Sequence, residues 1–124
     1  MRYMMFIKHT EDYRGRTIPP ALIQAMGELV GENTKKGIFI DGNGLKSSHK
    51  GKKVELRDGQ LRVIDGPFTE TKELVGGYAI VEVSSDEEAL DIAMKFMELH
   101  RVHWPGFEGE TELRPIETGA PGSE

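Results

Sequence analysis

The sequence contains no cysteine, which excludes disulfide bonds, thiolate metal sites and cysteine nucleophiles. It also lacks any apolar run near the roughly 20 residues that a membrane-spanning helix needs. The first ten residues, MRYMMFIKHT, have too short an apolar stretch, too soon followed by charge, for a signal peptide. We therefore expect a cytoplasmic protein that does not enter a membrane.

Basic charge is also scarce, since 16 Lys and Arg stand against 21 Asp and Glu and give a net charge of -5. Nucleic-acid binding depends mainly on Lys and Arg that neutralise phosphates, so no nucleic-acid partner is expected. The 124 residues suit a single domain with its own hydrophobic core. We expect that domain over residues 1–117 and a disordered tail over the small and polar residues 118–124.

Hydrophobic periodicity divides the chain into strands and helices. Strands are predicted over 2–9, 38–42, 77–83 and 110–117, helices over 19–37 and 84–100, and a hairpin over 52–65. In the first strand both faces are apolar, which predicts a central strand covered on two sides. The hairpin turns at Asp58-Gly59, which pairs Leu56 with Leu61 and Val54 with Val63 on one face. Ser85 and Glu88 form the predicted capping box of the second helix.

This order of elements predicts an α+β fold: a ferredoxin-like βαββαβ plan with an extra hairpin, in which two helices cover one face of an antiparallel sheet. The other sheet face would then be bare, although the first strand supplies apolar residues to it. A symmetric homodimer that packs two such sheets face to face around an enclosed space would cover it. A monomer whose loops cover the sheet is the alternative.

Five segments carry a family resemblance: MRYMMFIK, DGNGL, VIDGPFTETKELVGGYAIVEV, SSDEEALDIA and ETELRPIE. Through them, residues 1 to about 117 resemble the YCII-related family, and within it the DGPF-domain branch. The resemblance implies a dimeric α+β barrel, related to small cofactor-independent enzymes such as muconolactone isomerases. Some relatives carry a catalytic His on the first helix and an Asp before a Pro after the second. Here the first helix opens PPALIQ and Trp104 precedes Pro105, so that mechanism does not carry over.

The stretch DGPFTETKEL, residues 65–74, has two interpretations. Asp65 can accept hydrogen bonds from the amides that follow and lock a corner between strands, with Gly66 and Pro67 shaping the turn. Alternatively, the long connection overhangs a cleft, in which case Asp65 is a candidate catalytic group, and Phe68 and Glu70 are candidate substrate-binding residues. For Asp65 we favour the corner, and for Glu70 a solvated charge.

The remaining candidates lie on the strands and after the second helix. His9, at the end of the first strand, is a candidate general base, and Tyr78 is a candidate catalytic phenol. Tyr3 and Lys8 are candidate substrate-binding residues. For His9 a hydrogen-bonded histidine at the end of a strand is an equal alternative, and for Tyr3 and Tyr78 packing is the simpler interpretation. His100 and His103 have the spacing H-x-x-H, but without a third ligand they are better explained by the helix dipole than by metal. No metal and no cofactor is expected.

Two function classes remain. The first is a small-molecule site in the dimer cleft, including a cofactor-independent isomerase or lyase that works by proton transfer, with His9 or Asp65 as base and Tyr78 or Lys8 polarising a carbonyl. This requires His9 and Asp65 to converge on one cavity. The second is a non-catalytic regulatory module with a protein partner, since the resemblance links DGPF-branch proteins to transcription initiation. The acidic charge argues against direct DNA contact in either class.

Overall fold

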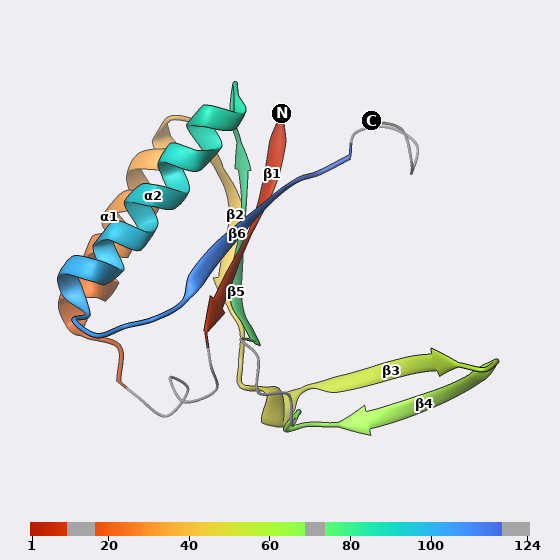
Figure 1. The fold of residues 1–124 in the computed structure, drawn as a ribbon. Coiled ribbons are helices and arrows are strands. Elements are labelled where there is room, and N and C mark those ends of the chain that lie inside the picture. The colour runs from red at the N-terminus through yellow and green to blue at the C-terminus, as the bar shows by residue number, and fades with distance from the viewer. Residues whose placement is uncertain (10–16, 69–73, 118–124) are drawn as a thin grey trace.

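The computed structural model describes residues 1–9, 17–68 and 74–117. Four strands form an antiparallel sheet in the order β2-β5-β1-β6. The strands are β1 (Arg2–His9), β2 (Phe39–Gly44), β5 (Leu74–Glu82) and β6 (Glu110–Pro115). Helices α1 (Pro20–Lys35) and α2 (Asp86–His103) lie side by side on one face of this sheet (Figure 1). The element order and strand order are those of a ferredoxin-like α+β fold.

The predicted elements form within three residues of their expected bounds, with three-residue shifts at the start of β5 and at the end of α2. This strand begins at Leu74, three residues before the predicted start, because an irregularity in the pairing at Gly76 lets Lys8 pair with Val75 and His9 with Leu74. Helix α2 runs to His103, past the predicted end. Neither described helix combines the length and apolar character needed to cross a membrane. The tail 118–124 lies outside the described residues.

The predicted cap of α2 is present with one difference. The Ser85 hydroxyl accepts a hydrogen bond from the Glu88 amide at 3.1 Å, and the Glu88 carboxylate accepts one from the Ser84 amide at 3.0 Å. The glutamate therefore reaches one residue further back than a standard capping box, and both hydrogen bonds hold the chain where β5 passes into α2. The first turn is acidic, which suits the positive end of the helix dipole.

The hydrophobic core lies between the sheet and α2. Tyr3 and Met5 of β1 pack with Val81 of β5, with Val83 just after this strand, and with three residues of α2, namely Ala89, Ile92 and Ala93. The other face of β1 carries Met4 and Phe6, which are only partly buried and have no helix over them (Figure 1). The two-faced apolar pattern of the first strand therefore gives one covered face and one open face within a single chain.

Strands β3 (Lys52–Arg57) and β4 (Gln60–Asp65) form a separate two-stranded sheet. Asp58 and Gly59 both have positive φ, 51° and 76°, as the turn requires. The register pairs Leu56 with Leu61 and Val54 with Val63, the pairs that the turn predicts. Figure 1 shows this hairpin projecting away from the sheet, on the side opposite the helices.

The corner at residues 65–68 holds the end of the hairpin against the segment that precedes it. The Gly66 amide donates to the Gly51 carbonyl at 3.0 Å, and the Phe68 amide donates to the Ser48 hydroxyl at 3.4 Å. Ser48 begins the short 3-10 helix η2 (Ser48–Lys50). A Cβ on Gly66 would lie 1.6 Å from the Ser48 carbonyl oxygen, so no other residue fits without moving backbone. The contacts of this corner are structural.

We expect Gly66→Ala to lower the free energy of unfolding by about 1–3 kcal/mol, because the added methyl group overlaps the Ser48 backbone. Urea unfolding measures this change. Gly31→Ala is the matched control: it lies in α1 with no atom within 4 Å of the added Cβ, and should stabilise by roughly 0.5–1 kcal/mol. Equal unfolding free energies for the two variants would contradict the packing of the corner.

Candidate functional site

A cavity of about 540 Å³ lies between the helices and the sheet, where β1 ends and β5 begins. Its walls come from β1, β2, β5, both helices and the turn after α2. The volume falls in the range of roughly 300–1,000 Å³ that small-molecule sites occupy. Among the described residues that line it there is no Lys, Arg, Asp or Glu. The walls therefore suit a neutral and mainly apolar molecule.

Small residues in the sheet create this space. Gly42 pairs with Ala79, and Gly77 pairs with Gly44 on one side and with Ile7 on the other. These positions lie on the helix-facing side, in register with the core residues of β1, and all five residues line the cavity. Because glycine has no side chain, the layer between sheet and helices is left unfilled at this end. The segments DGNG and GGYA thus produce the cavity.

His100 is the buried polar residue of this region, with 6% of its surface exposed. Its Nδ1 lies 2.9 Å from the Phe96 carbonyl oxygen, so Nδ1–H donates and the lone pair stands on Nε2. Its ring lies 4.7 Å from the Phe96 ring and 4.9 Å from the Phe107 ring, between centroids. Burial lowers the pKa of His100, and the nearby His9 lowers it further, against the opposing effect of the Phe96 carbonyl. His100 is therefore neutral at pH 7.

His9 lines the same cavity from the end of β1. Its ring lies directly over Gly76: a Cβ on that glycine would be 2.0 Å from Nε2. The irregular pairing beside Gly76 and the missing side chain together make room for the imidazole. Two imidazoles from distant parts of the chain, one on a strand and one on a helix, thus border a single apolar space.

Trp104 and Phe107 close the cavity beyond the end of α2. Their ring centroids lie 5.1 Å apart, and the Phe107 amide donates to the Trp104 carbonyl at 3.0 Å. Gly106 has φ of 87°, a conformation that favours glycine, and it lets the turn bring Phe107 back beneath the helix. The turn therefore adds two aromatic walls to the site.

Comparison with known proteins places the chain in a family. The YCII-related domain matches residues 1–97, more than half of the sequence. The chain belongs to the YCII-related family. It is also 38% identical, over 64 residues, to an uncharacterised protein from Rhizobium meliloti (strain 1021), a match that covers 52% of this chain and 48% of that protein. The chain thus matches about half the length of this relative.

The family match covers only part of the cavity. His9 and the glycines of β2 and β5 lie within the matched residues 1–97 of this YCII-related protein, whereas His100, Trp104 and Phe107 lie beyond them. His100 therefore lies outside the segment that identifies the family.

Of the candidate catalytic residues, the structure brings only His9 into the cavity by its ring. Tyr78 borders it through its strand, but its hydroxyl donates to Asp41 Oδ2 at 3.1 Å on the opposite sheet face, where Tyr78 pairs with Phe6. Asp65 lies at the base of the projecting hairpin in an exposed ion pair with Lys52. His9 and Asp65 thus do not share this cavity.

The candidate substrate-binding residues are dispersed. Tyr3 is in the core, with its hydroxyl bonded to Asp86, which raises the pKa of the phenol. Lys8 pairs with Glu112 on the open face of the sheet. Phe68 lies at the hairpin corner, with the Lys53 ammonium 4.4 Å from its ring centroid. Glu70 lies outside the described residues.

One pattern in the sequence indicates the cavity, but it extends beyond the predicted end of the second helix. Phe96, His100 and Trp104 follow one another at intervals of four and so share one side of α2 and its end. The predicted helix ends at His100, and the H-x-x-H spacing pairs this histidine with His103 as possible metal ligands. In the structure these two histidines border different spaces, and no group of three metal-ligating side chains gathers among the described residues.

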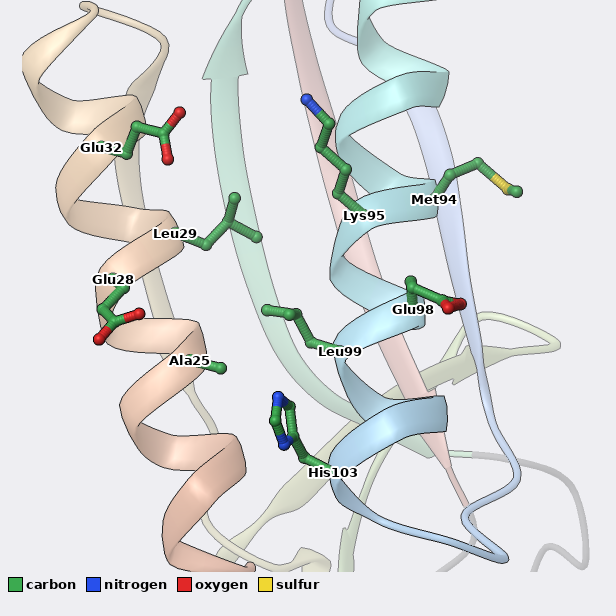
Figure 2. A pocket seen from close by; sticks show the side chains of 9 residues that line it. All are labelled: Ala25, Glu28, Leu29, Glu32, Met94, Lys95, Glu98, Leu99 and His103. Carbon is green, nitrogen blue, oxygen red and sulfur yellow. The ribbon is translucent and has the colours of Figure 1, made fainter.

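His103 borders an open groove between α1 and α2, of about 650 Å³ (Figure 2). Leu29 and Leu99 face each other across its floor, while Glu28, Glu32 and Glu98 stand along its rims (Figure 2). Its glutamates are engaged locally: Glu32 with Lys36 at 3.0 Å and Glu98 with Arg101. This groove is a solvated helix surface, and the cavity with the two imidazoles is the better candidate site.

The lowered pKa of His100 predicts a pH dependence of stability. Below the ordinary pKa of about 6.5, the histidine of the unfolded chain takes up a proton that His100 of the folded protein does not. The free energy of unfolding therefore decreases as the pH is lowered from about 6.5 to the pKa of the folded protein. We expect His100→Gln to lose this part of the decrease.

The measurement is the free energy of unfolding in urea at about pH 7.5 and about pH 5.5 for the wild type and the variant. His103→Gln is the matched control, since His103 lies three residues away in the open groove and its variant should keep the wild-type decrease. A His100→Gln variant with an unchanged decrease would contradict the buried, neutral imidazole.

Proposed function

We propose that this YCII-related protein binds a small neutral organic molecule in the cavity between its helices and its sheet. The ligand has an apolar, planar body and one acidic hydrogen, as in a phenol, an enol or an enolisable lactone. The observation that carries the proposal is the buried His100, which keeps an Nε2 lone pair at an otherwise apolar cavity. Two imidazoles among mainly apolar walls favour a mainly apolar ligand with a small number of hydrogen-bonding groups.

The walls support this choice of ligand class. Aromatic rings of Phe39, Phe96, Trp104 and Phe107 surround the space, and flat ligands pack well against such rings. A carboxylate ligand would need a cation, and the described lining residues include no lysine or arginine. Phenols and lactones should therefore bind better than simple carboxylates.

We expect a phenol or lactone present at about 100 times its Kd to stabilise the protein by about 2.7 kcal/mol, seen as a rise in the melting temperature. Gly44→Val should remove that rise, because the side chain fills the cavity while the backbone site has room for it, its nearest neighbour being 4.0 Å from the added Cβ. Gly31→Ala, at an exposed position of α1 outside the cavity, should respond as the wild type does.

The screen compares phenols, lactones, carboxylates and metal ions under one set of conditions. A phenol or lactone whose stabilisation survives Gly44→Val would bind elsewhere and contradict the proposed site. Stabilisation by carboxylates or metal ions alone would contradict the proposed ligand class.

We propose further that the site transfers a proton on the bound molecule without a cofactor. His100 is neutral and can accept a proton from a carbon next to the ligand carbonyl through Nε2. His9, at the same cavity, supplies a second imidazole that returns a proton to another atom of the ligand. Removal at one atom and return at another isomerises the ligand. One turnover leaves a proton on His100 and takes one from His9, so His100 then gives its proton to water and His9 takes one up, which restores the protein.

This proton transfer predicts that the protein speeds the exchange of the ligand's acidic C–H for deuterium in D2O, followed by NMR. His100→Gln should reduce the exchange rate by roughly 100-fold or more, the usual contribution of a general base. Ligand binding, measured in parallel, should weaken much less. Exchange that persists in His100→Gln would leave binding as the function and remove the catalytic role.

We also propose that the chain belongs to the DGPF branch of its family and works as a homodimer. The corner Asp65-Gly66-Pro67-Phe68 supports the first point. The open sheet face supports the second, because Met4, Phe6 and Ile80 are partly exposed there with no helix over them. Two copies that pack these faces together would bury both apolar surfaces. A cleft between the two sheets would then be a second space, on the other side of the sheet from the cavity.

A further inference from the structure

One face of the β3–β4 hairpin carries four apolar side chains that are largely exposed. Val54, Leu56, Leu61 and Val63 are 69%, 69%, 73% and 66% exposed. They form two directly opposite cross-strand pairs, Val54 with Val63 and Leu56 with Leu61, and so make one continuous patch. Soluble proteins rarely leave such a contiguous patch uncovered.

The hairpin has little else to stabilise it. A two-stranded hairpin alone is marginally stable in water and needs a third strand or a packed face. Among the described residues, β3 and β4 contact chiefly each other, and Figure 1 shows them extending beyond the sheet and away from the helices. We call the segment Lys46–Asp65, which contains the hairpin and the loop before it, the arm. The Gly66 corner bonds to Gly51 and packs against Ser48, and so keeps the two ends of the arm together.

The charge of the arm differs from that of the rest of the chain. Residues 46–65 include six Lys and Arg and three Asp and Glu, whereas the remaining residues include ten and eighteen. Two arms from two copies would repel each other, while an arm and the body of another copy attract. The arm also extends on the side of the open sheet face, where the proposed second copy would lie (Figure 1).

We propose that the arm clasps a second copy of this chain, with the face formed by Val54, Leu56, Leu61 and Val63 packed against apolar surface of the partner's body and the arm's basic side chains beside that body's acidic groups. By two-fold symmetry each copy gives one arm and receives one, so the contact closes at two copies. The inference rests on the proposed homodimer and adds the segment that holds it together. The corner DGPF then has a defined task, since its bonds to Ser48 and Gly51 keep the two ends of the arm together.

The test uses the full chain in sedimentation velocity across a range of protein concentrations. The double variant Leu56→Ser/Leu61→Ser removes one apolar pair, and we expect it to weaken dimerisation by roughly 100-fold or more. The double variant Glu55→Gln/Arg62→Gln is the matched control. It changes the neighbouring cross-strand pair on the opposite face of the hairpin, an exposed ion pair at 3.2 Å, and should dimerise as the wild type does within a few-fold.

Hydrogen exchange of the wild type provides a measurement that does not depend on how the variants fold. Amides of β3 and β4 should be protected at concentrations where the protein is dimeric and should exchange faster on dilution, while β1 and β5 stay protected. Higher salt should weaken the dimer, because it screens the attraction between arm and body.

The outcomes separate the arm from the dimer itself. A wild type that remains monomeric at about 100 µM would overturn both the homodimer and the clasp. A dimer that Leu56→Ser/Leu61→Ser leaves intact, or whose β3 and β4 amides exchange freely, would overturn the clasp and leave the sheet-to-sheet dimer standing. A dimer that strengthens with salt would contradict the arm-to-body contact.

Discussion

The structure depends on β1, which is hydrogen-bonded along both edges and apolar on both faces. Its pairing with β5 and β6 makes it a central strand and places the first and last strands side by side, with β6 at the edge of the sheet. Along its helix-facing side, Tyr3 and Met5 enter the core, and Ile7 and His9 then enter the cavity. Within seven residues, one strand thus contributes first to the hydrophobic core and then to the wall of the cavity. The change comes where the neighbouring strands have glycine in place of larger residues.

The cavity forms where the fold leaves part of the layer between sheet and helices unfilled. Glycines in β2 and β5 leave out the side chains that would have extended the core. His100 is held in a buried setting, where desolvation disfavours its charged form and the Phe96 carbonyl selects its tautomer. Burial alone would destabilise a charged histidine; with Nδ1 bonded to the Phe96 carbonyl and a lowered pKa, the imidazole is buried in its neutral form.

The DGPF stretch, the most distinctive in the sequence, belongs to a different part of the molecule from the cavity. Gly66 is required because the Ser48 backbone occupies the place of any side chain. Asp65 pairs with Lys52 at the base of the hairpin. A distinctive motif therefore marks a packing constraint, and it lies in the connection between the compact body and a projecting arm with an uncovered apolar face.

The sequence by itself determined the local elements, because a period of two or 3.6 residues, a Ser85 cap and an Asp58-Gly59 turn act within a few residues. It thereby determined the ferredoxin-like order and the hairpin register. Only the tertiary structure decided that His9 and His100 line one cavity, that the Tyr78 hydroxyl lies on the other sheet face, and that Asp65 stays at the surface. These outcomes depend on which segments far apart in the chain pack together, and on where glycine leaves space between them, which no local pattern specifies.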